Sequence, residues 1–125
     1  MWPLRIENPI FLQTIYGHYP DLSSVEITSS TMSRDGPSMR LSFISTVLPY
    51  RPPKKWGPFN AVVFELVFFA VDSVSLRRFQ GNGFSSIRMW DDGGKVLLTC
   101  EGAVRLSPTS RYLYIKGISG ISQSP

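Results

Sequence analysis

The stretch "NAVVFELVFFAV", residues 60–71, is the most apolar part of this chain and decides its fold class. Its valines and phenylalanines lose rotamer freedom in a helix and pack readily on a pleated surface, so we interpret it as a strand and not as a buried helix. Successive side chains of a strand alternate, which gives one side Val62, Phe64, Leu66 and Phe68 and the other Val63, Glu65, Val67 and Phe69. Because both sides are largely apolar, we expect a central strand covered by a second sheet on one side and by an N-terminal helix on the other.

Hairpin patterns flank this strand on both sides. Upstream, "SVEITSSTM" and "MRLSFISTV" are joined by "SRDGPS", in which Asp35-Gly36 suits the positive φ angles of a tight turn. The second of these segments alternates, which predicts that Met39, Leu41, Phe43 and Val47 share one side. Downstream, "DSVSLRRF" reads as a separate alternating strand, and "SSIRMW" and "KVLLTC" flank the acidic-glycine turn at residues 91–94.

The sequence at the two ends of the chain predicts less secondary structure. Asn8 can cap a short helix that has Pro9 at its first position and ends before Gly17. We expect two short strands, at residues 104–106 and 112–116, and a frayed tail at residues 118–125. The predicted fold is therefore mostly β, at the margin of α+β: a two-layer antiparallel β-sandwich, or as second choice a partly open barrel, with a short N-terminal helix.

Length and composition fit one soluble domain spanning residues 1–125. The 125 residues are 42% hydrophobic and 18% charged, which supplies a core and argues against disorder. A single cysteine, Cys100, excludes an intrachain disulfide and fits a reducing compartment. The opening "MWPLRIENP" lacks the apolar core of a secretory signal, and the longest apolar run is shorter than the ~20 residues that cross a bilayer. We expect a cytoplasmic protein without a membrane partner.

The residues that could carry catalysis are few. His18 stands in a polar connector, and Cys100 is in register with Val96 and Leu98, which directs it into the core. A Cys–His pair remains an alternative, although no third orienting group is evident. Asp91 and Asp92 precede two glycines and are better explained by a turn. We expect no catalytic residue, no cofactor, no metal site and no enzymatic activity.

The connector "YRPPKKW", residues 50–56, is the strongest candidate for recognition of a partner. Two prolines stiffen it and keep it out of an ordinary interior strand. We expect Trp56 to pack inward with Phe59 while its neighbours form a preformed surface, because tyrosine and arginine are frequent interface anchors. The predicted partner-binding residues are Tyr50, Arg51, Lys54, Lys55 and Trp56 in the connector and Arg77, Arg78 and Arg88 on strands.

Nucleic-acid binding is the alternative function. Small β modules bind single strands by stacking bases on exposed aromatic rings beside cations, and Trp56 and Trp90 with the same arginines and lysines could do so. The cations do not alternate with aromatic residues along one strand face, and a net charge of +4 is small for this purpose. A nucleic-acid partner therefore ranks below a protein partner.

Five short motifs follow one another along the first half of the chain. They are Asn8-Pro9, "YGxxPxL" from Tyr16 to Leu22, "RDGP" from Arg34 to Pro37, "PPKKW" from Pro52 to Trp56, and "FNxVxxxL" from Phe59 to Leu66. In this order they resemble the immunity protein 50 family of bacterial polymorphic toxin systems, and the resemblance covers the first half of the chain. It implies a cytoplasmic antitoxin that is not an enzyme and that binds and neutralises one cognate toxin domain by stoichiometric occlusion. Immunity proteins that act against nucleases are often acidic and imitate nucleic acid, whereas this chain is basic. Either the toxin is therefore not a nuclease, or the contact with it is steric or mixed in charge.

Overall fold

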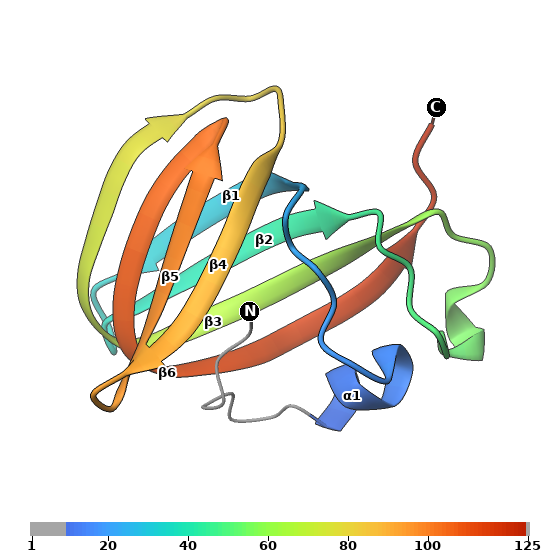
Figure 1. Ribbon diagram of the computed structural model, residues 1–125, viewed down its shortest axis with the longest axis horizontal. Helices are drawn as coiled ribbons and strands as arrows, with labels where there is room; N and C mark the ends of the chain where they lie inside the picture. Colours follow the sequence, from blue (N-terminus) through green and yellow to red (C-terminus); the bar gives the residue numbers. More distant parts are fainter. Residues whose placement is uncertain (1–9, 125) are drawn as a thin grey trace.

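The computed structural model describes residues 10–124 and shows six antiparallel strands rolled into one barrel (Figure 1). The elements in chain order are α1 (Ile10–Tyr16), β1 (Val25–Ser33), β2 (Ser38–Ser45), the 3-10 helix η1 (Lys54–Trp56), β3 (Ala61–Phe79), β4 (Ser85–Asp92), β5 (Lys95–Gly102) and β6 (Val104–Ile121). The strand order is β1-β2-β3-β6-β5-β4, and one residue pair, Val25 with Ser85, joins β4 to β1 and completes the ring. The mostly β prediction with a short N-terminal helix is confirmed, and the narrow seam makes the ring resemble the partly open barrel.

The two longest strands, β3 and β6, pair along their whole length and bend around the barrel (Figure 1). The sequence predicts separate strands in both places. In β3 the chain continues past Ala70, which has φ 52°, a left-handed conformation that is uncommon for a residue other than glycine. In β6 the chain continues through Pro108, and the ladder with β5 is interrupted between Leu106 and Thr109, because proline has no N–H to donate.

The core lies on the inner side of the barrel. The predicted inner side of β3 is confirmed, since Val62, Phe64, Leu66 and Phe68 are all fully buried. The Phe64 ring stacks on Phe43 with 5.1 Å between centroids and lies 5.9 Å from the ring of Tyr16, which is part of α1. The helix therefore packs against the inner side of β3. The prediction that it covers the outer side is wrong, because the rolled sheet leaves one end of its interior open and the apolar side of α1 fills that end.

Neighbouring side chains cover much of the outer side of β3. Phe69 stacks on Tyr114 of β6 with 5.0 Å between centroids, and the Glu65 carboxylate lies 3.7 Å from the Lys116 ammonium. Val67 is buried there. A strand that is apolar on both sides thus needs no second layer outside, since long side chains of the adjacent strand provide the cover.

The hairpin turns are confirmed, and two predictions about the margins are wrong. Val47 is exposed because β2 ends at Ser45, before the predicted alternation would place it inside. The tail does not fray at residues 118–121, where β6 continues and Ile118 is buried. The Asn60 side chain holds the next residues, with Oδ1 accepting from the Gln123 N–H at 2.7 Å and Nδ2 donating to the Gln123 carbonyl at 2.9 Å. The predicted cap at Asn8 and Pro9 lies outside the described residues.

Candidate partner-binding surfaces

The connector between β2 and β3 is anchored at both ends and exposed in its middle. The Arg51 N–H donates to the Ile15 carbonyl of α1 at 2.7 Å, and Trp56 packs against the core and edge-to-face on Phe59 with 5.3 Å between centroids. Tyr50 is 77% exposed, and the Arg51 guanidinium lies 5.7 Å from the centre of its ring. The expected division, with Trp56 inward and its neighbours in water, is confirmed, because Tyr50, Arg51, Lys54 and Lys55 are all exposed.

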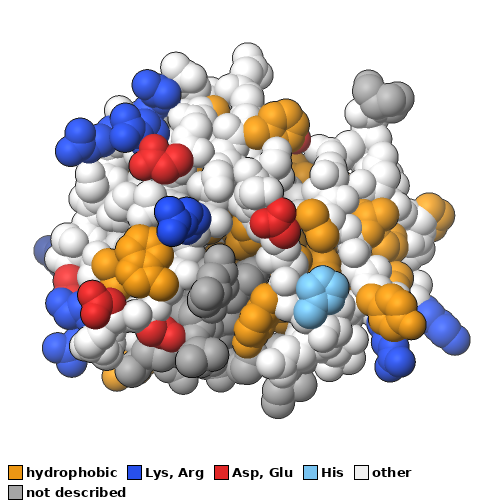
Figure 2. Space-filling view, in the orientation of Figure 1, with side chains coloured by type: hydrophobic (Ala, Val, Ile, Leu, Met, Phe, Trp, Pro, Cys, Tyr) orange, Lys and Arg blue, Asp and Glu red, His pale blue; other side chains and the backbone are white. Residues whose placement is uncertain are grey.

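The predicted arginines on the strands do not join this connector. Arg77 and Arg78 lie near the end of β3, whereas η1 lies near its beginning, and roughly 50 Å of extended chain separates Ala61 from Arg77. Figure 2 shows Lys and Arg side chains gathered at opposite ends of the visible face, near the end of β3 and near η1 in Figure 1. The eight predicted residues therefore form separate surfaces, since β3 runs the length of the molecule between them.

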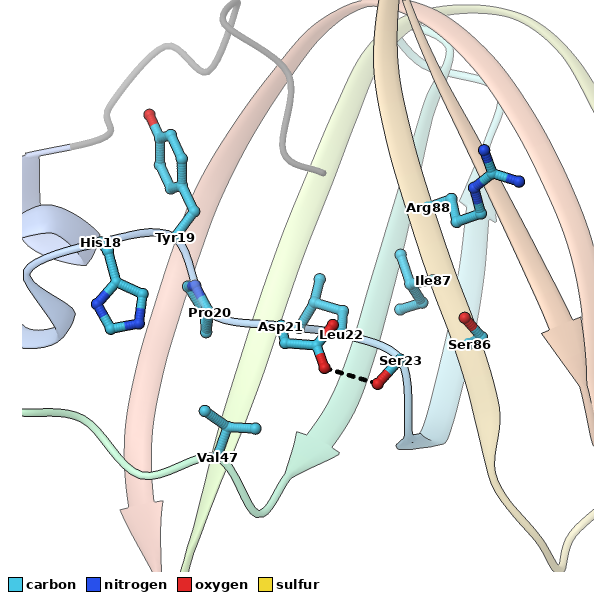
Figure 3. Close-up of a pocket in the computed structure, with 10 residues that line it drawn as sticks. All are labelled: His18, Tyr19, Pro20, Asp21, Leu22, Ser23, Val47, Ser86, Ile87 and Arg88. Carbon is cyan, nitrogen blue, oxygen red and sulfur yellow. Dashed lines mark hydrogen bonds between the residues drawn. The ribbon is translucent and has the colours of Figure 1, made fainter.

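Arg88 belongs to a third place, a pocket of about 520 Å³ beside the barrel seam (Figure 3). The segment between α1 and β1 crosses β4 there, and the Ile87 N–H donates to the Leu22 carbonyl at 2.8 Å. The Ser23 hydroxyl donates to Asp21 at 2.7 Å, and the Arg88 side chain points away from Asp21 and from His18. The lining residues are His18, Tyr19, Pro20, Asp21, Leu22, Ser23, Val47, Ser86, Ile87 and Arg88.

Sequence reasoning did not group these residues into a pocket. The available signal was the motif "YGxxPxL" from Tyr16 to Leu22, which supplies one wall of it. Val47 and the β4 residues come from distant parts of the chain. Pairing at the seam and the Ile87–Leu22 hydrogen bond bring the β4 residues to that wall, and the Tyr16–Val47 hydrogen bond holds Val47 there.

The structure does not assemble the Cys–His pair. Cys100 is buried in the core, and this burial raises the pKa of its thiol, which disfavours the nucleophilic thiolate. His18 is exposed and lines the seam pocket instead. Asp91 and Asp92 end β4 at a turn in which Gly93 and Gly94 both have positive φ angles, as the sequence predicts.

Within residues 10–124, no three His, Cys, Asp or Glu side chains lie close enough together to hold a metal ion. In the same part of the chain, no helix combines the length and the apolarity that crossing a membrane requires.

The motif residues inside the described range hold the fold together. The Tyr16 hydroxyl donates to the Val47 carbonyl at 2.8 Å, and Leu22 is buried. The "RDGP" motif is the β1–β2 turn, with Gly36 at φ 119°, and Trp56 and Asn60 make the contacts described above. The motifs thus specify the barrel and its closures.

Comparison with protein-family models gives a match to the family described as Immunity protein 50 over residues 8–120. No curated protein and no solved structure matches the chain. The family match covers nearly the whole chain and includes β4, β5 and most of β6, where the sequence motifs offered no support. The name of the family indicates an immunity role in toxin systems. The chain belongs to the immunity protein 50 family.

Proposed function

We propose that this protein is a cytoplasmic immunity protein that binds one cognate toxin domain of a bacterial polymorphic toxin system and neutralises it by stoichiometric occlusion. The observation that carries this proposal is the family match over residues 8–120. The protein acts as a binder and not as an enzyme, and residues 1–125 work as one domain. A standard interface of about 800 Å² on each partner supports nanomolar affinity if a few anchors are well buried.

The rigid scaffold favours tight binding. The connector is fixed by the Arg51–Ile15 hydrogen bond and by the Trp56–Phe59 contact, so little order must be gained when Tyr50 and Arg51 meet a partner. The end of β3 offers a second surface with Arg77 and Arg78. One interface of standard size engages one of these two ends, because they lie far apart along β3.

The test is a binding and protection experiment with the toxin domain encoded beside this gene. We expect calorimetry to give a one-to-one complex with a Kd in the nanomolar range or below, and toxin activity to disappear at equal molar amounts. The variants His18→Ala and Cys100→Ala should protect as well as the wild type when folded, because occlusion uses neither group. Protection at far less than equimolar protein, or its loss in a folded His18→Ala variant, would indicate catalysis and contradict the proposal.

The alternative function, binding of single-stranded nucleic acid, has one observation in its favour. Arg88 and Trp90 are both exposed and two residues apart on β4, so they share one side of the strand. The dependence of binding affinity on salt concentration distinguishes the two functions. Affinity for an oligonucleotide that falls steeply between about 50 and 200 mM salt, without a toxin complex, would favour the alternative.

A further inference from the structure

We propose that the free edge of β3 from Ser73 to Phe79, called here the β3 edge, accepts an extended acidic segment of the toxin domain as an additional strand. The identity of the partner rests on the proposed function. The mode of binding and the chemistry of the segment follow from the backbone, the apolar side chains and the charges of the edge.

The backbone of the β3 edge has a partner on one side. β2 pairs with β3 as far as Phe69, and the Val71 N–H donates to the Pro37 carbonyl at 3.0 Å. From Ser73 onward, β6 is the strand that pairs with β3 within residues 10–124, through Thr109 to Val104. The outward row of N–H and C=O groups is therefore open to another chain, which is the requirement for recognition by strand addition.

An apolar strip accompanies this open backbone. Val74, Leu76 and Phe79 lie directly opposite Pro108, Leu106 and Val104, and paired residues share one face of a sheet. The three residues on β6 are buried, whereas Leu76 and Phe79 remain 50% and 47% exposed, because their strand is the last of its layer. An added strand would cover both with its own inward side chains.

The charge of the β3 edge selects an acidic segment. Arg77 and Arg78 are exposed, and the nearby acids are engaged elsewhere. Asp72 lies 2.7 Å from the Lys95 ammonium, whose hydrogen bond holds the pKa of that carboxyl below its usual range, and Glu101 lies 3.0 Å from Arg105. The edge therefore carries uncompensated positive charge.

The same charge argues against a second copy of this chain as the occupant. Pairing two identical edges would bring Arg77 and Arg78 of one copy toward those of the other, and like charges on neighbouring strands are destabilising. A segment that alternates acidic and apolar residues satisfies the open backbone, the apolar strip and the arginines together. The toxin is the partner that can supply it.

Protection against aggregation is the competing explanation for the arginines and the register shifts of the β3 edge. Proteins place arginine or lysine and β-bulges on free edges to prevent aggregation, and the register of β3 shifts at Asp72 and Arg77. A protected edge would remain open in the toxin complex. Hydrogen exchange of the backbone amides distinguishes the two explanations.

The experiment measures amide exchange of the full chain, free and in complex with the toxin domain, and compares two double variants. Arg77→Glu with Arg78→Glu reverses the charge of the edge. Arg34→Glu with Arg40→Glu makes the same charge change at exposed arginines on the β1–β2 hairpin. We expect at least tenfold slower exchange of alternate amides in Ser73–Phe79 in the complex, and at least a tenfold larger Kd for the edge variant alone.

Each outcome decides the proposal. A tight complex that leaves the amides of Ser73–Phe79 unprotected overturns strand addition and leaves the immunity function intact. The absence of any complex with the wild type refutes both. Protection that grows with protein concentration without the toxin shows that a second copy occupies the edge and also overturns the proposal. The exchange result holds even if the edge variant does not fold.

Discussion

Replacement of Gly102 by alanine should destabilise the barrel at its narrow seam. Gly102 has φ 144°, where side chains are rarely tolerated, and an added Cβ would overlap the Phe84 carbonyl oxygen and lie 2.8 Å from the Ser85 Cα. Both contacts are with backbone, so no side chain can turn away to relieve them. Ser85 also forms the pair with Val25 that completes the ring, and its hydroxyl accepts the Val104 N–H at 3.0 Å.

The expected cost comes from two sources. A non-glycine residue in a sparsely populated backbone region costs about 1–3 kcal/mol. Displacing well-packed neighbours costs about 1–3 kcal/mol more. A total of about 3 kcal/mol is a large share of the roughly 5–15 kcal/mol that stabilises a domain, and it lowers Tm by roughly 10 °C at this chain length.

Urea unfolding followed by tryptophan fluorescence measures this change. The matched control is Gly117→Ala in β6, where an added Cβ meets no atom within 4 Å and the φ angle is ordinary. We expect the free energy of unfolding of this control to stay within about 1 kcal/mol of the wild type. If Gly102→Ala were equally well tolerated, the close approach of β5 to Ser85 would be wrong, and with it the description of the seam.

Three further predictions concern the interior. Phe64→Ala removes a fully buried ring stacked on Phe43 and should lower the free energy of unfolding by about 3–5 kcal/mol. Phe79→Ala, at a half-exposed position, should lower it by less than about 1 kcal/mol. Similar urea midpoints for the two variants would contradict the assigned core. Burial raises the pKa of Tyr16 above its ordinary 10.0, so the wild type should lose stability as pH rises above about 10, where the unfolded chain releases this proton. Tyr16→Phe should lack that part of the loss. Equal slopes of the free energy of unfolding against pH for the two proteins in this range would disprove the prediction. The buried Cys100 thiol, with its raised pKa, should react with a thiol reagent only as fast as the protein opens, so immediate stoichiometric labelling of the native protein would contradict its position.

The sequence predicts the fold well where one local pattern dominates. The apolar run at residues 60–71 and the turns at Asp35-Gly36 and Gly93-Gly94 each combine a strong residue preference with a matching period, and all three are confirmed. The continuity of β3 could not be predicted in this way. Beyond Val71 the strand loses one neighbour, and its residues become exposed without regular alternation. The pattern there reflects tertiary exposure and not the conformation of the chain.

The sequence predicts which residues of the candidate surfaces are exposed, but it does not predict how these residues are grouped in space. Exposed tyrosine, arginine and lysine can be selected from composition, and the structure confirms that Tyr50, Arg51, Arg77 and Arg78 are exposed. Their separation depends on the length and bend of β3, which no local pattern specifies. The seam pocket depends even more on tertiary structure, because pairing at the seam and two hydrogen bonds, Ile87–Leu22 and Tyr16–Val47, bring its walls together.

The motif residues and the exposed residues of β3 have different roles, and this difference favours the β3 edge over the connector as the partner-binding surface. The motif from Pro52 to Trp56 places Trp56 against Phe59 and Gly120, so its stiffness is already explained by closure of the barrel end. Ser73 to Phe79 belong to none of the motifs and pair with β6 on one side, yet on the other side they leave apolar surface and backbone groups open to water. Leu76 and Phe79 belong to one apolar strip and keep about half of their surface in water, an arrangement that is typical of a surface covered by a partner.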